Sequence, residues 1–209
     1  MKKLIDNLKE RGLLKETKLE QAFLKIDRKN FVPEKLKTKA YEDRPLPIGE
    51  GQTISQPSTV AFMLDLLNPQ KGDKILDIGF GSGWTTGLLM EIVGQEGEVV
   101  GVERVPEIKK WGERNLISIF NKERLNLICG DGYLGYQKKS PYDKILVSAA
   151  LSAEEEIPSS WYDQLVMGGV VVAPIGSYIY KLTKRADRFE KERYFGFRFV
   201  PLIKDEKDD

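Results

Sequence analysis

Apolar residues near the start of the chain recur at helical spacing. Leu19, Phe23 and Ile26 lie three or four positions apart, which is the pattern of one buried helix face. Thr17 and Glu20 have the spacing of a capping box, so this helix is expected to begin at Thr17. With another short helix ahead of it, the chain is expected to open with two short helices.

The next segment, residues 41–57, has no regular pattern. Prolines and glycines interrupt it at Pro45, Pro47, Gly49 and Gly51. Residues of these two types break helices and strands, so we expect a loop here. Apolar positions then favour a helix over residues 58–67.

From residue 74 onward, short apolar runs alternate with helical patterns. The runs cover residues 75–78, 98–103, 125–129, 144–147 and 170–173. Leu88, Leu89 and Ile92 mark the first intervening helix, and Pro106 suits the first turn of the second. Such alternation predicts an α/β fold of three layers, in which a doubly wound, mostly parallel sheet is covered on both faces.

The end of the chain changes pattern again. Residues 178–182 and 194–200 flank a charged turn and alternate as strands do, which predicts an antiparallel hairpin at the sheet edge. Residues 204–209 are expected to form a solvated tail.

The overall composition is that of an ordinary globular protein. Of 209 residues, 41% are apolar and 31% charged, and 33 Lys and Arg balance 32 Asp and Glu, so no net charge points to nucleic acid or to an acidic membrane. No apolar run approaches the length of a membrane span, and the start does not resemble a signal peptide. The single cysteine, Cys129, excludes an internal disulfide and is expected to be buried and inert. A cytoplasmic location is expected.

Histidine is absent from the sequence. Ser-His-Asp hydrolysis, Cys-His nucleophiles and histidine-ligated metals are therefore excluded, and no metal site is predicted. The chemistry must depend on carboxylates, hydroxyls, backbone groups or a bound cofactor.

A glycine-rich segment, residues 77–84, stands where the first parallel strand meets its helix. Glycine at alternate positions allows a tight turn and a close approach to a ligand. A dinucleotide fingerprint would need another glycine at position 84, where Trp84 stands, so a cofactor without phosphates is favoured.

Acidic residues follow the next two strands. Glu103 ends the second strand, where a carboxylate can accept both hydroxyls of a ribose, and Asp131 and Gly132 close the third, beside the expected adenine. Any one of these features alone is more typical of a shaped loop or a solvated acid. Together and in this order, they favour a nucleoside cofactor.

These three motifs resemble those of the Rossmann-like class I methyltransferases that use S-adenosyl-L-methionine. In addition, residues 46–57 resemble the signature of the protein-L-isoaspartate (D-aspartate) O-methyltransferases. Further similarity to that family lies in residues 28–33, 40–43, 130–136, 141–143, 174–176 and 199–202. The resemblance covers roughly residues 21–202.

The resemblance implies which residues form the site. Those assigned to the cofactor and its product S-adenosyl-L-homocysteine are Gln52, Thr53, Asp77, Gly79, Phe80, Gly81, Gly83, Glu103, Asp131 and Gly132. Ser55 is assigned to catalysis and, with Ile54, to the acceptor, which is the free carboxylate of an L-isoaspartyl residue in a damaged protein. D-aspartyl residues remain an open second acceptor. From spacing alone, Ser55 is better explained as the N-cap of the helix that follows, and only the surrounding signature favours the acceptor role.

The family resemblance also divides the chain. A single domain over residues 1–209 would comprise N-terminal helices with an acceptor loop (1–57), a cofactor core (58–176), edge strands (177–203) and a tail (204–209). The protein is expected to be a monomer whose partners are isoaspartyl-containing proteins, with neither nucleic acid nor membrane among them.

Alternatives stay open at this point. A nucleic-acid methyltransferase should show a basic stripe, and a small-molecule O-methyltransferase does not need the run from Gln52 to Ser55. A non-catalytic binding module is the third alternative. Glu50 and the acidic loop at residues 151–156 depart from the family pattern, and we expect the loop to be solvated.

Overall fold

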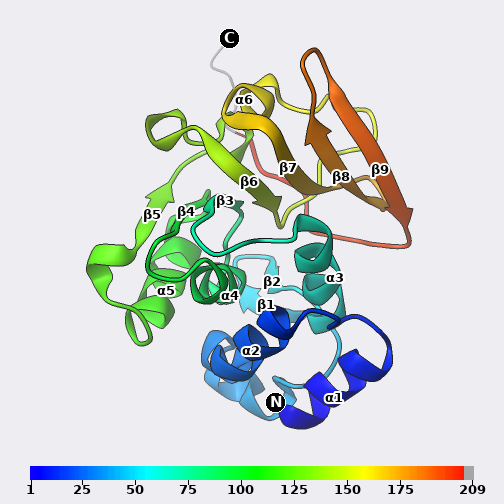
Figure 1. Ribbon diagram of the computed structural model, residues 1–209. Helices are drawn as coiled ribbons and strands as arrows, with labels where there is room; N and C mark the ends of the chain where they lie inside the picture. The colour runs from blue at the N-terminus through cyan, green and yellow to red at the C-terminus, as the bar shows by residue number, and fades with distance from the viewer. Residues whose placement is uncertain (205–209) are drawn as a thin grey trace.

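A seven-stranded sheet with helices on both faces forms the centre of the computed structural model, which describes residues 1–204 (Figure 1). The strand order is β5-β4-β3-β6-β7-β8-β9. In chain order the strands are β3 (Lys74–Ile78), β4 (Glu98–Glu103), β5 (Asn126–Cys129), β6 (Tyr142–Val147), β7 (Leu165–Ile175), β8 (Tyr178–Lys184) and β9 (Phe189–Phe195). Those from β3 to β7 run parallel, and β8 and β9 are antiparallel. The predicted sheet is confirmed.

Alternate residues of the central strands belong to two separate apolar clusters, one on each face of the sheet. Ile75 and Val99 join the cluster on the face covered by α3 (Pro57–Leu67), α4 (Trp84–Val93) and α5 (Pro106–Ile117). Leu76 and Val100 join the opposite cluster, which is covered by the short α6 (Ser159–Asp163) and by 3-10 turns. Strands with both faces apolar need cover on both sides, and this requirement produces the three layers.

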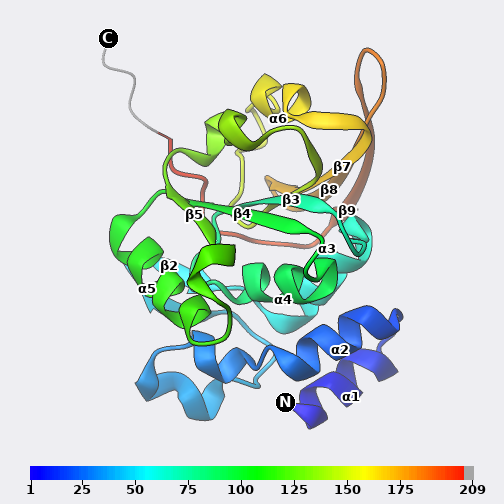
Figure 2. The same cartoon turned by 60° about the vertical axis from the view of Figure 1, so that its left-hand side comes forward.

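An additional helical layer is formed by the N-terminal part of the chain. Helices α1 (Lys2–Glu10) and α2 (Thr17–Lys25) pack outside α3 and α4, and two 3-10 turns follow, η1 (Arg28–Phe31) and η2 (Glu34–Lys39) (Figure 2). The two expected helices are confirmed, but the capping box is wrong. Glu16 is the N-cap residue, it makes no side-chain cap bond, and Thr17 is already helical.

The segment expected to be a loop contains a small hairpin. β1 (Leu46–Gly49) pairs with β2 (Gln52–Ile54), so the expectation for residues 41–57 is wrong in this part. Its turn residues Glu50 and Gly51 have φ values of 48° and 69°, as a two-residue hairpin turn requires. Leu46 and Ile48 of β1 are buried while the residue after each is exposed, so the hairpin has one face in the core.

The last strand is also displaced from its expected position. β9 ends at Phe195, and the predicted strand over residues 194–200 is wrong because Gly196, at φ 108°, turns the chain away from β8. Residues 196–203 instead run back across the molecule, where Ala150 donates its N–H to Val200 O at 2.8 Å and accepts one from Leu202 N at 2.8 Å (Figure 2). Of the predicted tail, Lys204 pairs with Glu155, and residues 205–209 lie outside the described part.

Trp84 and Trp161 are fully buried. Cys129, in contrast, is exposed because β5 is the edge strand of the sheet, so the prediction of a buried thiol is wrong. Within residues 1–204, none of the helices combines the length and apolarity needed to cross a membrane.

Candidate active site

Two concave features lie where the order of the strands reverses. The chain places β4 and β5 on one side of β3 and then crosses to place β6 on the other. In doubly wound sheets this reversal opens a crevice at the carboxyl ends of the strands. Here a pocket of about 680 Å³ opens between the end of β3, at Gly79, and the end of β6, at Ser148. We call it the inner pocket.

The glycine turn forms the floor of the inner pocket. Gly79 and Gly81 line it with φ values of 73° and 55°, a backbone region that residues with a Cβ rarely adopt. Gly83 lies behind the turn and does not line the pocket. A Cβ there would come within 2.9 Å of the Leu116 side chain, so this glycine allows α4 to pack against α5.

Glu103 holds the turn from the neighbouring strand. Its buried carboxylate accepts the N–H of Gly81 and the N–H of Val105, both at 3.0 Å. A carboxylate has about four lone-pair sites, so further sites remain on the side that lines the pocket. An acceptor of this kind fits the two hydroxyls of a ribose.

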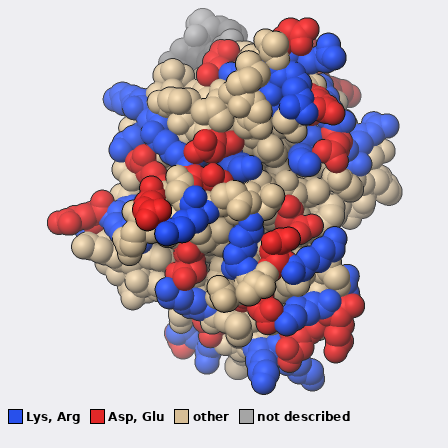
Figure 3. Space-filling model, viewed as in Figure 1, with Lys and Arg blue, Asp and Glu red and all other residues tan. Residues whose placement is uncertain are grey.

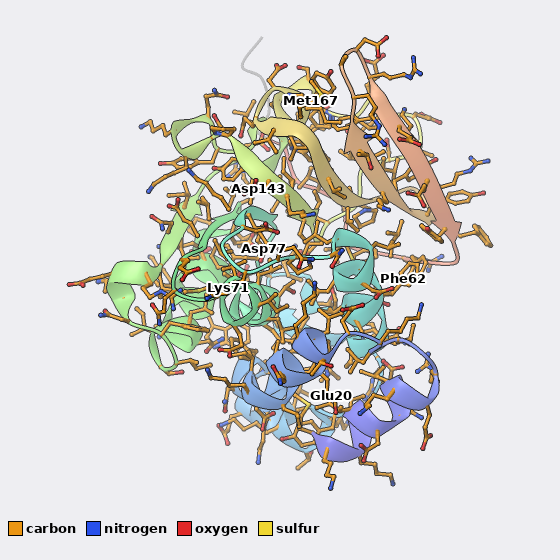
Figure 4. All side chains as sticks on the ribbon, in the orientation of Figure 1. Glu20, Phe62, Lys71, Asp77, Asp143 and Met167 are labelled. Carbon is orange, nitrogen blue, oxygen red and sulfur yellow. The ribbon has the colours of Figure 1, made fainter. Side chains whose placement is uncertain are left out.

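Asp77 supports the site from beneath. The side chain is fully buried inside the molecule and does not line the pocket (Figure 4). Its Oδ2 accepts the Thr86 hydroxyl at 2.7 Å, which ties β3 to α4, and Oδ1 has no partner among the described residues. Burial raises the pKa of Asp77 to about 7, against the opposing effect of the Thr86 hydrogen bond. The structure therefore places Asp77 behind the turn.

Of the Asp131-Gly132 motif, only Gly132 forms part of the pocket wall. Gly132 lines the pocket, and a Cβ there would lie 2.3 Å from Ile78, so only glycine fits. Asp131 is adjacent but is not among the lining residues, and its carboxylate accepts the N–H of Tyr133 at 2.8 Å. Apolar residues complete the wall: Ile78, Phe80, Val102 and Leu202. An uncharged, flat group such as adenine fits this surface.

The family-signature segment closes the pocket on its other side. All four residues expected there, Gln52, Thr53, Ile54 and Ser55, line the inner pocket. Ser55 is not the N-cap of α3, because Gln56 holds that position and its side chain makes no cap bond. The cap interpretation of Ser55 is therefore wrong, and its hydroxyl is not committed to the helix end.

A second concavity, the outer groove, meets the inner pocket at Ser55. It measures about 1020 Å³ and shares Thr53, Ser55, Ser148 and Val200 with the pocket. Its other lining residues are Pro45, Gln56, Thr59, Gly196, Phe197, Arg198 and Phe199. Phe197 stacks on Phe62 of α3, with ring centroids 5.3 Å apart and planes 11° apart, and this contact fixes one wall. Phe62 is labelled on α3 in Figure 4.

Sequence reasoning missed much of this wall. Residues 200–203 line the inner pocket and residues 196–200 line the groove, although the segment was expected to be a sheet edge. The signal was present, because residues 199–202 match a family motif, but their aromatic alternation favoured a strand. Ser148, Ala149 and Arg104 are further lining residues that no motif of the cofactor site indicated.

The acidic residues that depart from the family pattern are mostly exposed. On the face shown in Figure 3, basic and acidic side chains alternate without a stripe of one sign. Glu50 is exposed at the hairpin tip. In the acidic loop, Glu154 and Glu156 are exposed, while Glu155 accepts the N–H of Ser152 and pairs with Lys204. The expectation of a solvated loop is confirmed.

Known proteins match this chain over nearly its whole length. A sequence model of the protein-L-isoaspartate(D-aspartate) O-methyltransferase family matches residues 1–207. The protein-L-isoaspartate O-methyltransferase of Methanopyrus kandleri is 39% identical over 209 residues, which cover 98% of this chain and 91% of that protein. A solved protein-L-isoaspartate O-methyltransferase superposes with a TM-score of 0.87 at 31% identity over 96% of this chain, which spans 65% of that protein. A Plasmodium falciparum structure of the same description, in complex with S-adenosyl-L-homocysteine, has a TM-score of 0.83 at 26% identity over 97% of both chains.

The fold, the glycine turn and the buried carboxylate at the switch point define a Rossmann-like, S-adenosylmethionine-dependent methyltransferase. Within that class, the chain belongs to the protein-L-isoaspartate(D-aspartate) O-methyltransferase family. These matches do not favour the small-molecule, nucleic-acid or non-catalytic alternatives.

Proposed function

We propose that this chain methylates the free carboxylate of L-isoaspartyl residues in damaged proteins, and that Ser55 orients that carboxylate. One observation carries the proposal: Ser55 lines both the inner pocket and the outer groove. A group bound in the pocket and a peptide bound in the groove would therefore meet at this side chain.

The inner pocket would hold S-adenosylmethionine. Glu103 would accept the ribose hydroxyls, the backbone at Gly79 and Gly81 would border the amino-acid portion, and Gly132 would leave room for the base. Gln52 and Thr53 would cover it from the side of the groove. When bound, this cofactor supplies a methyl group already activated on a sulfonium.

Ser55 has a positioning task, not a proton-transfer task. A carboxylate with a pKa near ~4 is ionised at neutral pH and needs no base, which suits a chain without histidine. The serine hydroxyl would donate a hydrogen bond to one carboxylate oxygen and leave the other free to react. Correct positioning of reacting groups can contribute about 7–11 kcal/mol.

The outer groove would bind the polypeptide on either side of the damaged residue. Its lining includes small polar side chains, among them Thr53, Ser55 and Thr59, together with the aromatic rings of Phe197 and Phe199. A groove with this lining suits a short extended peptide better than a compact metabolite. The methyl ester formed there would start repair, because the next main-chain nitrogen can displace methanol to give a succinimide, whose hydrolysis returns some normal aspartate.

A pair of variants tests the assigned roles. Ser55→Ala should lower kcat on an isoaspartyl peptide by about 10–100-fold, since mispositioned reactants lose rate, while the Kd of S-adenosyl-L-homocysteine stays within about threefold. Asp131→Ala should instead weaken cofactor binding, because it loosens the 3-10 turn that carries Gly132. Calorimetric titration beside steady-state kinetics measures both effects. Equal losses of cofactor affinity in the two variants would contradict the assignment.

We further propose that the protein is a cytoplasmic monomer that binds no nucleic acid. The near balance of 33 basic and 32 acidic residues, and their mixed distribution in Figure 3, support the absence of nucleic-acid binding. Light scattering after size-exclusion chromatography should give a mass close to 23.8 kDa. A mass near twice that value would overturn the monomer.

A further inference from the structure

A buried arginine links the N-terminal layer to the acceptor site. Arg28, in η1, is completely inaccessible to solvent, and its guanidinium is surrounded by main-chain oxygens. Removing a guanidinium from water is costly unless hydrogen bonds offset the loss, so an arginine at this depth must have specific partners.

Three carbonyl oxygens from separate parts of the chain accept from this one group. Nη1 donates to Ala40 O at 2.7 Å, and Nη2 donates to Arg44 O at 3.1 Å and to Ser55 O at 3.0 Å. The rigid planar fork of arginine fixes these carbonyls relative to one another, which a flexible lysine cannot do equally well. The carbonyl of Ser55 is thereby held at a defined place.

Neighbouring contacts restrict the same unit further. The Arg28 guanidinium lies over the Trp84 ring at 5.4 Å, and Trp84, which lines the inner pocket, donates its indole N–H to Ile26 O at 3.1 Å. Three residues beyond Ser55, the N–H of Ser58 donates to Asp43 at 2.8 Å. Ser55 and Ser58 are therefore both held by hydrogen bonds to residues that precede the β1–β2 hairpin.

We propose that Arg28 is a positioning residue for methyl transfer, acting through the main chain of Ser55. Arg28 itself lines neither the groove nor the pocket, so it would set the place of the serine hydroxyl without binding either reactant. The N-terminal layer is then part of the catalytic geometry, in addition to covering α3 and α4. This inference rests on the role proposed for Ser55.

Arg28 variants should therefore lose turnover but keep their affinity for the peptide and the cofactor. We expect Arg28→Met to lower kcat by about 100-fold and Arg28→Lys by about 10-fold, since a displacement near 1 Å can cost about that much. The peptide KM and the Kd of S-adenosyl-L-homocysteine should stay within about threefold in both. Partial recovery by lysine reflects its ability to reach some of the three carbonyls.

Loss of stability must be distinguished from loss of positioning. Leu8→Ala is the matched control, because Leu8 is fully buried in α1 and contacts no part of the site, so this variant weakens the N-terminal layer alone. All variants are assayed at a temperature where circular dichroism shows them folded. If Arg28→Met does not fold, Arg28→Lys against Leu8→Ala decides the question.

Failure of the role proposed for Arg28 can be distinguished from failure of the role proposed for Ser55. If the Arg28 variants retain the kcat of Leu8→Ala, or lose cofactor affinity as much as turnover, the positioning role is wrong. If Ser55→Ala itself retains normal kcat, the role proposed for Ser55 fails, whatever the Arg28 variants do.

Discussion

The carboxylate of Glu103 accepts the N–H of Gly81 at 3.0 Å, and this bond joins the ends of two neighbouring parallel strands. The residue that faces the pocket therefore also fixes the turn that forms its floor. A hydrogen bond to an ionised acceptor is among the stronger ones in proteins. Cofactor affinity and the shape of the turn should consequently change together.

Replacing the Glu103 carboxylate should show that cofactor affinity depends on it. Glu103→Gln keeps the size of the side chain but removes the charge that strengthens its hydrogen bonds, so the Kd of S-adenosyl-L-homocysteine should rise about 10–100-fold. Glu107→Gln, on the exposed first turn of α5, is the matched control and should bind normally. Unchanged affinity in Glu103→Gln, measured by calorimetric titration, would contradict the ribose assignment.

A glycine in α5 should also be sensitive. Glycine to alanine within a helix is usually stabilising by about 0.5–1 kcal/mol, but a Cβ on Gly112 would lie 2.4 Å from the carbonyl oxygen of Gly81. Gly112→Ala should therefore destabilise the fold by about 1–3 kcal/mol and weaken cofactor binding, because the glycine turn must move. Lys110→Ala, exposed on the same helix, should do neither. Thermal melting and calorimetry test the pair, and a more stable Gly112→Ala would refute the close approach.

The regular part of the fold was predictable because its residues follow simple rules. Apolar runs placed every parallel strand, and β4 matches its predicted bounds. The glycine turn and Glu103 line the inner pocket as their strand-end motifs predicted, whereas Ser55 was indicated by the family resemblance and not by its position before a helix. Asp77 was expected to bind the cofactor, yet its burial behind the turn depends on how α4 packs, which no local pattern gives.

The parts of the structure that the sequence did not predict depend on contacts between distant segments. The β1–β2 hairpin was missed because Pro47 and Gly49 suggested a loop, although the burial of Leu46 and Ile48 shows the alternation of a strand. Phe197 and Phe199 look like strand residues in the sequence, but Phe197 packs on Phe62 and both line the groove. Gly196 was the local signal that the strand ends.

Asp77 should make stability depend on pH. Burial raises its pKa in the folded protein from 3.8 to about 7, so the folded state holds the proton more tightly than the unfolded state does. The associated stability is fully present below the unfolded pKa and is lost as pH rises through about 7. At about 1.4 kcal/mol per pKa unit, the loss between about pH 5 and pH 8 is roughly 2–3 kcal/mol.

The Asp77→Asn variant should lack this part of the pH dependence. Asparagine cannot ionise, yet its carbonyl oxygen can still accept the Thr86 hydroxyl. Urea unfolding without cofactor, at both pH values, gives the difference between variant and parent. Identical pH dependence in the two proteins would show that Asp77 ionises normally in the folded state.

The outer groove should prefer acidic sequences around the damaged residue. Among its described lining residues, Arg198 is the one with a charged side chain. Arg198→Glu should lower the ratio of kcat/KM for isoaspartyl peptides flanked by Glu to those flanked by Lys by about three- to tenfold, the size of exposed charge interactions. Arg188→Glu, exposed in the β8–β9 turn, is the control. An unchanged ratio would mean that Arg198 does not contact the peptide.

Methyl transfer to matched peptides tests the central claim most directly. The protein is incubated with S-adenosylmethionine labelled in the methyl group and with one peptide in three forms, carrying L-isoaspartyl, L-aspartyl or D-aspartyl at the same position. Base-labile label is predicted in the L-isoaspartyl peptide, with none in the L-aspartyl form, and the D-aspartyl form measures the second acceptor. Equal labelling of the L-isoaspartyl and L-aspartyl peptides, or labelling of neither by a protein that binds the cofactor, would contradict the account.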